Sequence, residues 1–249
     1  MADAPRAAFY ARRGSRAADW LTILHPPYTA WHLSYVAIGA GLAPHLDWAV
    51  CWLSLAGFLL AVGIAAHALD EWNGRPLGTR ISARALWAAA IVSLAGAAAL
   101  GISVLHHTGL VLIPFIAAGI VLVLGYNLEL FGGALHTDLG FALAWGAFPA
   151  AVGYVAQAPP WTLPGTLSLI LVAGAATALS AAQRRLSTPA RSLRRKAIAV
   201  TGTIELADGT TQPINRAALL APLDGTLKLL SAAVPAFAAA LLLARWAGR

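Results

Sequence analysis

Long apolar runs, separated by short polar or basic segments, make up most of this chain. The run at residues 48–66 carries no formal charge, and about twenty such residues in a helix cross a hydrocarbon core of about 30 Å. Comparable runs predict spans at about residues 28–43, 48–70, 84–104, 110–126, 139–156, 165–182 and 227–244. The pattern predicts an all-α, polytopic transmembrane helix bundle of about seven spans.

The segments outside these runs predict smaller elements. Residues 17–24 suit a short interfacial helix that Pro26 and Pro27 end. Residues 197–214 alternate loosely around Asp208-Gly209, a common turn pair, which predicts a small extramembrane hairpin before the last helix. We interpret residues 1–249 as one membrane-embedded domain. Its accessory parts are a cytoplasmic arm with the interfacial helix at 1–24 and a cytoplasmic basic block with the hairpin flap at 183–214.

Composition supports the membrane assignment. The chain is 59% hydrophobic and 11% charged, whereas a soluble domain is roughly 25% charged. The net charge of +7 comes from residues clustered beside apolar runs, a pattern typical of contacts with lipid headgroups and not of nucleic-acid binding. Cys51 is the only cysteine, which excludes an intramolecular disulfide. No nucleotide-binding fingerprint is present.

The placement of arginine predicts the orientation. The connections at 70–84 and 183–215 are rich in arginine, whereas those at 44–47, 106–109 and 157–164 hold no lysine or arginine. The positive-inside rule therefore predicts a plasma (inner) membrane protein with a cytoplasmic N-terminus and cytoplasmic site loops. Arg245 and Arg249 are the exceptions to the rule.

A cluster of ionisable residues ends the second predicted span. His67, Asp70 and Glu71 follow the spacing i, i+3, i+4, which places them on one helix face. Ionisable groups at membrane depth are costly unless they pair, meet water or bind an ion, so the cluster is a candidate functional site. The alternative is a structural network in which these residues pair with Arg75 or Arg80.

The order of these elements resembles the UbiA superfamily of intramembrane prenyltransferases. In that family an aspartate-rich motif ends the second helix and an R-P-L stretch leads into the third, as Arg75-Pro76-Leu77 does here. The resemblance places His67 on the first aspartate of the motif and Asp70 on the second. Gly74 takes the third place, for which Glu71 is the nearest substitute.

The resemblance also implies a ligand set. Isoprenyl diphosphate would be held by Mg²⁺ on Asp70 and Glu71, which carry the catalytic role. The substrate-binding residues would be His67, Arg75, Arg80, Tyr126, Asn127, Arg184 and Arg185. The family's second aspartate motif is replaced here by Gln183, Arg184 and Arg185. Because a guanidinium matches phosphate oxygens, we expect Arg184 and Arg185 to replace the second metal.

We therefore expect an integral membrane prenyltransferase that moves an isoprenyl group from its diphosphate to a lipophilic or aromatic acceptor. The alternative is a non-catalytic lipid-binding or scaffolding protein that keeps the fold, in which the block at 183–196 is a lipid anchor. A transporter is disfavoured because the middle of the spans lacks charged residues. Expected partners are membrane lipids and the two substrates, and homo- or hetero-oligomers stay open.

Overall fold

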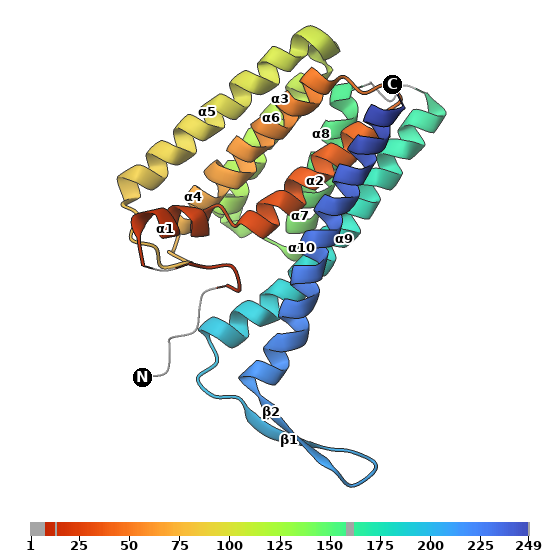
Figure 1. Cartoon of the computed structure of the whole chain (residues 1–249). Coiled ribbons are helices and arrows are strands. Elements are labelled where there is room, and N and C mark those ends of the chain that lie inside the picture. The colour runs from red at the N-terminus through yellow and green to blue at the C-terminus, as the bar shows by residue number, and fades with distance from the viewer. Residues whose placement is uncertain (1–7, 13, 158–161, 249) are drawn as a thin grey trace.

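The protein is a bundle of long helices, seen in a computed structural model that describes residues 8–12, 14–157 and 162–248 (Figure 1). Among these residues, five helical stretches are long and apolar enough to cross a membrane: Trp48–Trp72, Ala83–Asn127, Asp138–Gln157, Leu163–Arg195 and Arg216–Ala247. The prediction of a helical membrane protein is confirmed at this level. Residues 158–161, which belong to one predicted connection, lie outside the described part.

The first two helices form the entry to the bundle. Helix α1 (Arg16–Ile23) begins at Ser15, whose hydroxyl accepts the N–H of Ala18 at 3.1 Å. Helix α2 (Pro26–Leu42) has proline in its first turn, where no N–H is needed. Between them His25 adopts a left-handed conformation, with φ of 45°. This sharp change of direction lets α2 enter the bundle while α1 stays at its end (Figure 1).

The second stretch changes its helical type along its length. It consists of α3 (Trp48–Phe58), the π-helical segment η1 (Leu59–Ala66) and α4 (His67–Trp72). The carboxylate of Asp47 caps α3 by accepting the N–H groups of Ala49 and Val50. π-Helical turns are rare and recur at functional sites.

The third stretch is a pair of helices. Helix α5 (Ala83–Thr108) is followed by the 3₁₀ turn η2 (Gly109–Leu112) and α6 (Ile113–Asn127). Gly109 has φ of 70°, which glycine adopts readily, and the chain reverses there. A Cβ placed on Gly101 would lie 3.0 Å from Ile116 Cγ1, so α5 and α6 lie side by side. The predicted turn at 106–109 is therefore shorter than expected, because the helix continues through Thr108.

The next stretch packs against α2. After the short turn η3 (Phe131–Gly133) come α7 (Asp138–Ala142), the π-helical segment η4 (Leu143–Ala147) and α8 (Phe148–Gln157). A Cβ on Gly39 would lie 2.1 Å from the carbonyl oxygen of Ala150, and one on Gly153 would lie 2.2 Å from that of Val36. The backbones of α2 and α8 thus meet where side chains are absent, as small residues allow between membrane helices.

Helix α9 (Leu163–Arg195) is longer than the sequence pattern predicts. The expected span ended near residue 182, but the helix continues through the basic block, for a length of about 50 Å. Arginine, leucine and alanine favour helix there, and Pro189 lies inside the helix. The Arg184 side chain pairs with Asp138 at 2.8 Å, and Arg194 pairs with Asp224.

The predicted hairpin is confirmed. Strands β1 (Thr201–Glu205) and β2 (Thr211–Asn215) pair antiparallel, with Thr201 opposite Asn215. The turn contains Gly209 at φ of 82°. The hairpin extends beyond the helices at one end of the molecule and leads into α10 (Arg216–Ala247), which runs the length of the bundle (Figure 1).

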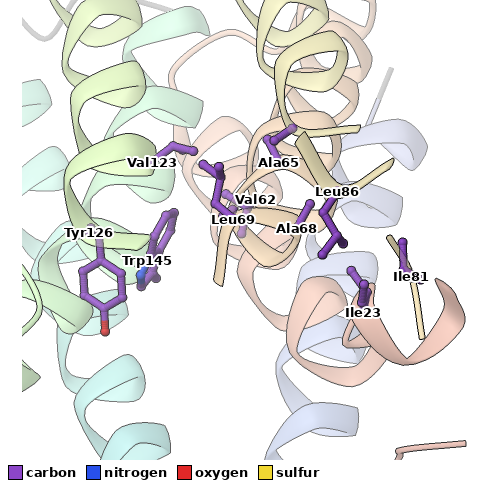
Figure 2. Packing of buried hydrophobic residues seen from close by; sticks show 13 residues of the cluster. Ile23, Val62, Ala65, Ala68, Leu69, Ile81, Leu86, Val123, Tyr126 and Trp145 are labelled. Carbon is purple, nitrogen blue, oxygen red and sulfur yellow. The ribbon is translucent and has the colours of Figure 1, made fainter. Parts of the chain in front are cut away.

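The largest buried cluster joins η1, α4, α5, α6 and η4. Figure 2 shows Tyr126 beside Trp145 at one edge of this cluster and Ile23 with Ile81 at the other. The rings of Tyr126 and Trp145 meet edge to face, with centroids 5.5 Å apart at 84°. This packing fixes the ends of α4 and α6 next to each other, at the same end of the bundle as the hairpin (Figure 1).

Candidate functional site

A polar cavity of about 140 Å³ opens among the ends of α2, α4, α6, α7 and α9. Five of the residues predicted from the sequence line it: His67, Asp70, Tyr126, Asn127 and Arg184. The other lining residues with polar side chains are Tyr10, His25, Tyr28, His32, His136, Gln183, Ser187, Arg191, Arg194 and Arg195. Four of the predicted residues do not line it: Glu71, Arg75, Arg80 and Arg185.

Asp70 is the carboxylate of this cavity. It lies in α4 and is partly buried, and it makes no hydrogen bond or ion pair with a residue that the structure describes. The charge of Arg191 acts on it electrostatically. Asp70 therefore faces the space that a ligand would fill.

Glu71 has a different environment. Its side chain is fully buried, at 0% exposure. Its Oε2 accepts the N–H of Leu77 at 2.8 Å, and its Oε1 accepts the N–H and the hydroxyl of Thr79 at 2.8 and 2.9 Å. Both oxygens thus hold the loop between α4 and α5.

The two arginines of that loop also have local partners. Arg75 donates to the carbonyl oxygens of Ile81, at 2.6 Å, and Thr79, at 3.4 Å. Arg80 pairs with Asp19 of α1 at 3.3 Å, and its side chain is 65% exposed. These contacts tie the loop to itself and to α1, and neither arginine reaches the cavity.

Helix α9 supplies the positive charge of the cavity. Arg184, Arg191, Arg194 and Arg195 line it, whereas Arg185 is exposed on the same helix. Sequence reasoning included only the first of the four. Residues 184, 191 and 195 lie on one face of a helix. The spacing identifies them as a group only if α9 continues through residue 195, which the sequence pattern did not predict.

Two aromatic groups from the N-terminal segment complete the site. The Tyr10 hydroxyl lies 2.6 Å from His25 Nδ1, and the His25 ring stacks on His67 with centroids 4.2 Å apart. His25 Nε2 is buried without a hydrogen-bond partner in the described chain. Burial, followed by the charge of His67, lowers the pKa of His25 well below its usual value, and burial raises the pKa of Tyr10.

Three further histidines of the cavity share one tautomer. The Nδ1 atoms of His32, His67 and His136 face the carbonyl oxygens of Trp145, Gly63 and Tyr126 at 2.7, 3.2 and 3.1 Å. A carbonyl only accepts, so each Nδ1 carries a hydrogen, and the neutral form of each ring keeps a lone pair on Nε2. These Nε2 atoms are available as hydrogen-bond acceptors or proton acceptors.

The metal site implied by the resemblance does not fit the residues present. Mg²⁺ requires several oxygen ligands, but both Glu71 oxygens are engaged by the loop. In the part of the chain that the structure describes, no group of three or more His, Cys, Asp or Glu side chains converges on a metal position. A Mg²⁺ ion carried by a diphosphate would find one carboxylate, that of Asp70.

An apolar cavity of about 100 Å³ adjoins the polar one. Side chains of α3, η1, α5, α6, η4 and α8 line it, and Val62 and Trp145 line both cavities. Val62 lies in η1 and Trp145 in η4, so both junction residues come from π-helical segments. The two cavities, one polar and one apolar, thus adjoin each other at these two residues.

Comparisons with protein-family models, with curated proteins and with solved structures give no match for this chain.

Proposed function

We propose that this membrane protein binds an isoprenyl diphosphate and transfers its isoprenyl group, as the UbiA-type prenyltransferases do. The observation that carries the proposal is the junction of the two cavities at Val62 and Trp145. An amphipathic ligand with an anionic head fits this arrangement, its diphosphate among the arginines of α9 and its chain between the apolar helices. Apolar surface buried by the chain contributes roughly 25 cal/mol per Å² to such binding.

The proposal includes a topology of seven spans with the polar cavity open to the cytoplasm. The reversal at Gly109 divides the longest stretch into two spans. Helix α2, with 17 residues and a length of about 25 Å, adds another. Arginine is concentrated at the end that holds the cavity, which supports its cytoplasmic side by the positive-inside rule.

The geometry suggests how transfer would proceed. The bond between the allylic carbon and the diphosphate oxygen breaks, and the arginines of α9 stabilise the charge on the leaving diphosphate. The allylic carbon lies at the junction, where the ring of Trp145 faces both cavities and an aromatic face stabilises a cation. The acceptor then bonds to this carbon, and the proton it loses goes to the lone pair on His67 Nε2.

A non-catalytic lipid-binding protein is the second candidate. The observation in its favour is that Glu71, expected as a catalytic carboxylate, is engaged in holding a loop. Release of labelled diphosphate from bound geranylgeranyl diphosphate, measured in native membranes that contain the natural acceptor, separates the two. Release above that of membranes without the protein supports transfer, whereas binding without release supports the second candidate.

The test of the site uses two valine variants. Val62→Phe fills the junction, whereas Val92→Phe makes the same change at a side chain 71% exposed on α5. We expect Val62→Phe to weaken binding of labelled geranylgeranyl diphosphate at least tenfold while short dimethylallyl diphosphate still binds, and Val92→Phe to bind both like the wild type. Unchanged binding of the long chain by a folded Val62→Phe variant would show that the chain does not enter the apolar cavity.

A further inference from the structure

We propose that Arg191 of α9 and the Nε2 hydrogen of His25 bind the anionic head directly, so that head binding needs no metal ion held by protein carboxylates. This inference rests on the proposed function, because it concerns the same ligand. It differs from the arrangement that the sequence resemblance implies, in which paired carboxylates hold the diphosphate through Mg²⁺.

The first argument is the charge balance of the cavity. Four arginines line it, and Asp70 is the only acidic residue among the described lining residues. Arg184 and Arg194 are paired with Asp138 and Asp224, which approach from α7 and α10. Arg191 makes no ion pair with any residue in the described ranges, although it is partly buried and lies on the lining. Asp70 acts on Arg191 electrostatically but forms no direct ion pair with it, so an anionic ligand would stabilise this partly buried guanidinium.

The second argument is the hydrogen-bond inventory of His25. The Tyr10 hydroxyl faces Nδ1 at 2.6 Å and has no other hydrogen-bond partner among the described residues. Because the hydroxyl has no other acceptor, we infer that it donates to Nδ1 and that the ring hydrogen lies on Nε2. That atom is buried and has no hydrogen-bond partner in the described chain, and His25 is one of the residues that line the cavity. A buried donor without an acceptor is costly, and a phosphate oxygen would satisfy it.

The third argument concerns position. The rings of His25 and His67 are stacked at 4.2 Å, so His25 lies beside the start of α4, which also carries Asp70. Arg191 and Arg195 both act electrostatically on His25 and on Asp70. Arg191 and His25 thus line the same cavity from α9 and from the residue before α2, and we infer that an anion there would meet donors from both.

The experiment measures binding of labelled geranylgeranyl diphosphate to the full-length protein in detergent, in EDTA and in Mg²⁺. Arg191→Gln removes the cation that lines the cavity, and Arg185→Gln makes the same change at the exposed arginine of the same helix. We expect the wild type to bind in EDTA, Arg191→Gln to bind roughly ten- to a hundredfold more weakly, and Arg185→Gln to stay within about twofold. Arg191→Lys, which keeps the charge without the fork, should fall between them.

A second variant and a competitor keep the outcome clear. His25→Asn tolerates the left-handed backbone and removes the Nε2 donor, so it should weaken binding in EDTA while its melting temperature stays near that of the wild type. Unlabelled geranylgeraniol lacks the diphosphate head. We therefore expect its affinity as a competitor to be the same for the wild type and for each variant. Inorganic diphosphate should displace the ligand from the wild type more effectively than from Arg191→Gln.

Three results would contradict the direct contact between Arg191, His25 and the head. If the wild type binds only with Mg²⁺, and Arg191→Gln binds as well as the wild type, the direct contact is wrong while the proposed function stands. If the wild type binds under neither condition, the proposed function fails and this inference fails with it. If anionic phosphatidylglycerol displaces the prenyl diphosphate at equal concentration, the site recognises lipid headgroups and both proposals for a prenyl ligand are overturned.

Discussion

Asp70 and Glu71 are adjacent in the chain, yet Asp70 lines the polar cavity while both Glu71 oxygens accept hydrogen bonds from the loop at Leu77 and Thr79. Successive residues of a helix point about 100° apart, so neighbouring carboxylates need not share a ligand. In this chain one carboxylate lines the cavity and the other holds the loop beside it, so the predicted pair does not act together.

Replacing Glu71 tests its structural role. Glu71→Gln turns one acceptor oxygen into a donor that faces N–H or hydroxyl groups, so we expect a loss of about 1–3 kcal/mol in unfolding free energy. Thermal unfolding in detergent measures it, with Arg80→Gln as the control. Arg80 forms an exposed pair with Asp19, and such a pair contributes at most about 1 kcal/mol. A Glu71→Gln protein as stable as the wild type would contradict the structural role.

Replacing Asp70 distinguishes direct binding from metal-bridged binding by the sign of the effect. Asp70 is a negative charge on the cavity lining, so it repels an anionic head unless a metal ion lies between them. We expect Asp70→Asn to bind geranylgeranyl diphosphate in EDTA at least as tightly as the wild type. A tenfold weaker affinity in EDTA would show that Asp70 is itself required for head binding.

The histidine at the start of α2 should make stability depend on pH. Burial keeps His25 neutral by lowering its pKa well below its usual value, whereas in the unfolded chain its pKa is about 6.5. The stability that the neutral His25 contributes to the folded protein is therefore fully present above about pH 6.5, and it decreases as the pH falls below that value. The titratable and charged groups around it are Tyr10, Tyr28, His32, His67, Arg191 and Arg195.

The measurement is the melting temperature between about pH 7.5 and 5.5. The wild type should lose stability toward the acid end, and His25→Asn should show a flatter profile because Asn does not titrate. Parallel profiles would mean that other histidines of the cavity dominate the acid response.

The contact of α2 with α8 should not tolerate added side chains. Gly39→Ala and Gly153→Ala each place a methyl group within 2.2 Å of a backbone oxygen, so the two helices must separate. We expect a loss of about 1–3 kcal/mol for each. Gly174→Ala is the control because nothing lies within 4 Å of its Cβ position, and Ala in a helix interior stabilises by up to about 1 kcal/mol. Equal stability of all three variants would contradict the close contact.

Several features of the fold could be predicted from the sequence because they depend on neighbouring residues. The apolar runs correspond to the helical stretches, and the pair Asp208-Gly209 marks the hairpin. Hydrogen bonds within a helix or a hairpin link residues a few positions apart, so local patterns are sufficient to predict them.

Other features required contacts between distant segments. Arg184 meets Asp138 across 46 residues and Arg194 meets Asp224 across 30, and these pairs hold the basic block as helix where the pattern predicted a polar connection. The two π-helical segments meet at the junction of the cavities, and nothing in the periodicity of residues 59–66 or 143–147 signals them.

The sequence by itself determined that this is a helical membrane protein with an arginine-rich end, because length, hydropathy and charge are sums over local residues. Only the tertiary structure decided that Asp70 lines the cavity, that Glu71 holds a loop and that Arg191 lines the same cavity as His25. The physical reason is that the direction of a side chain on a helix acquires meaning only when the neighbouring helices are in place. Small residues such as Gly39 and Gly153 set how closely those helices approach.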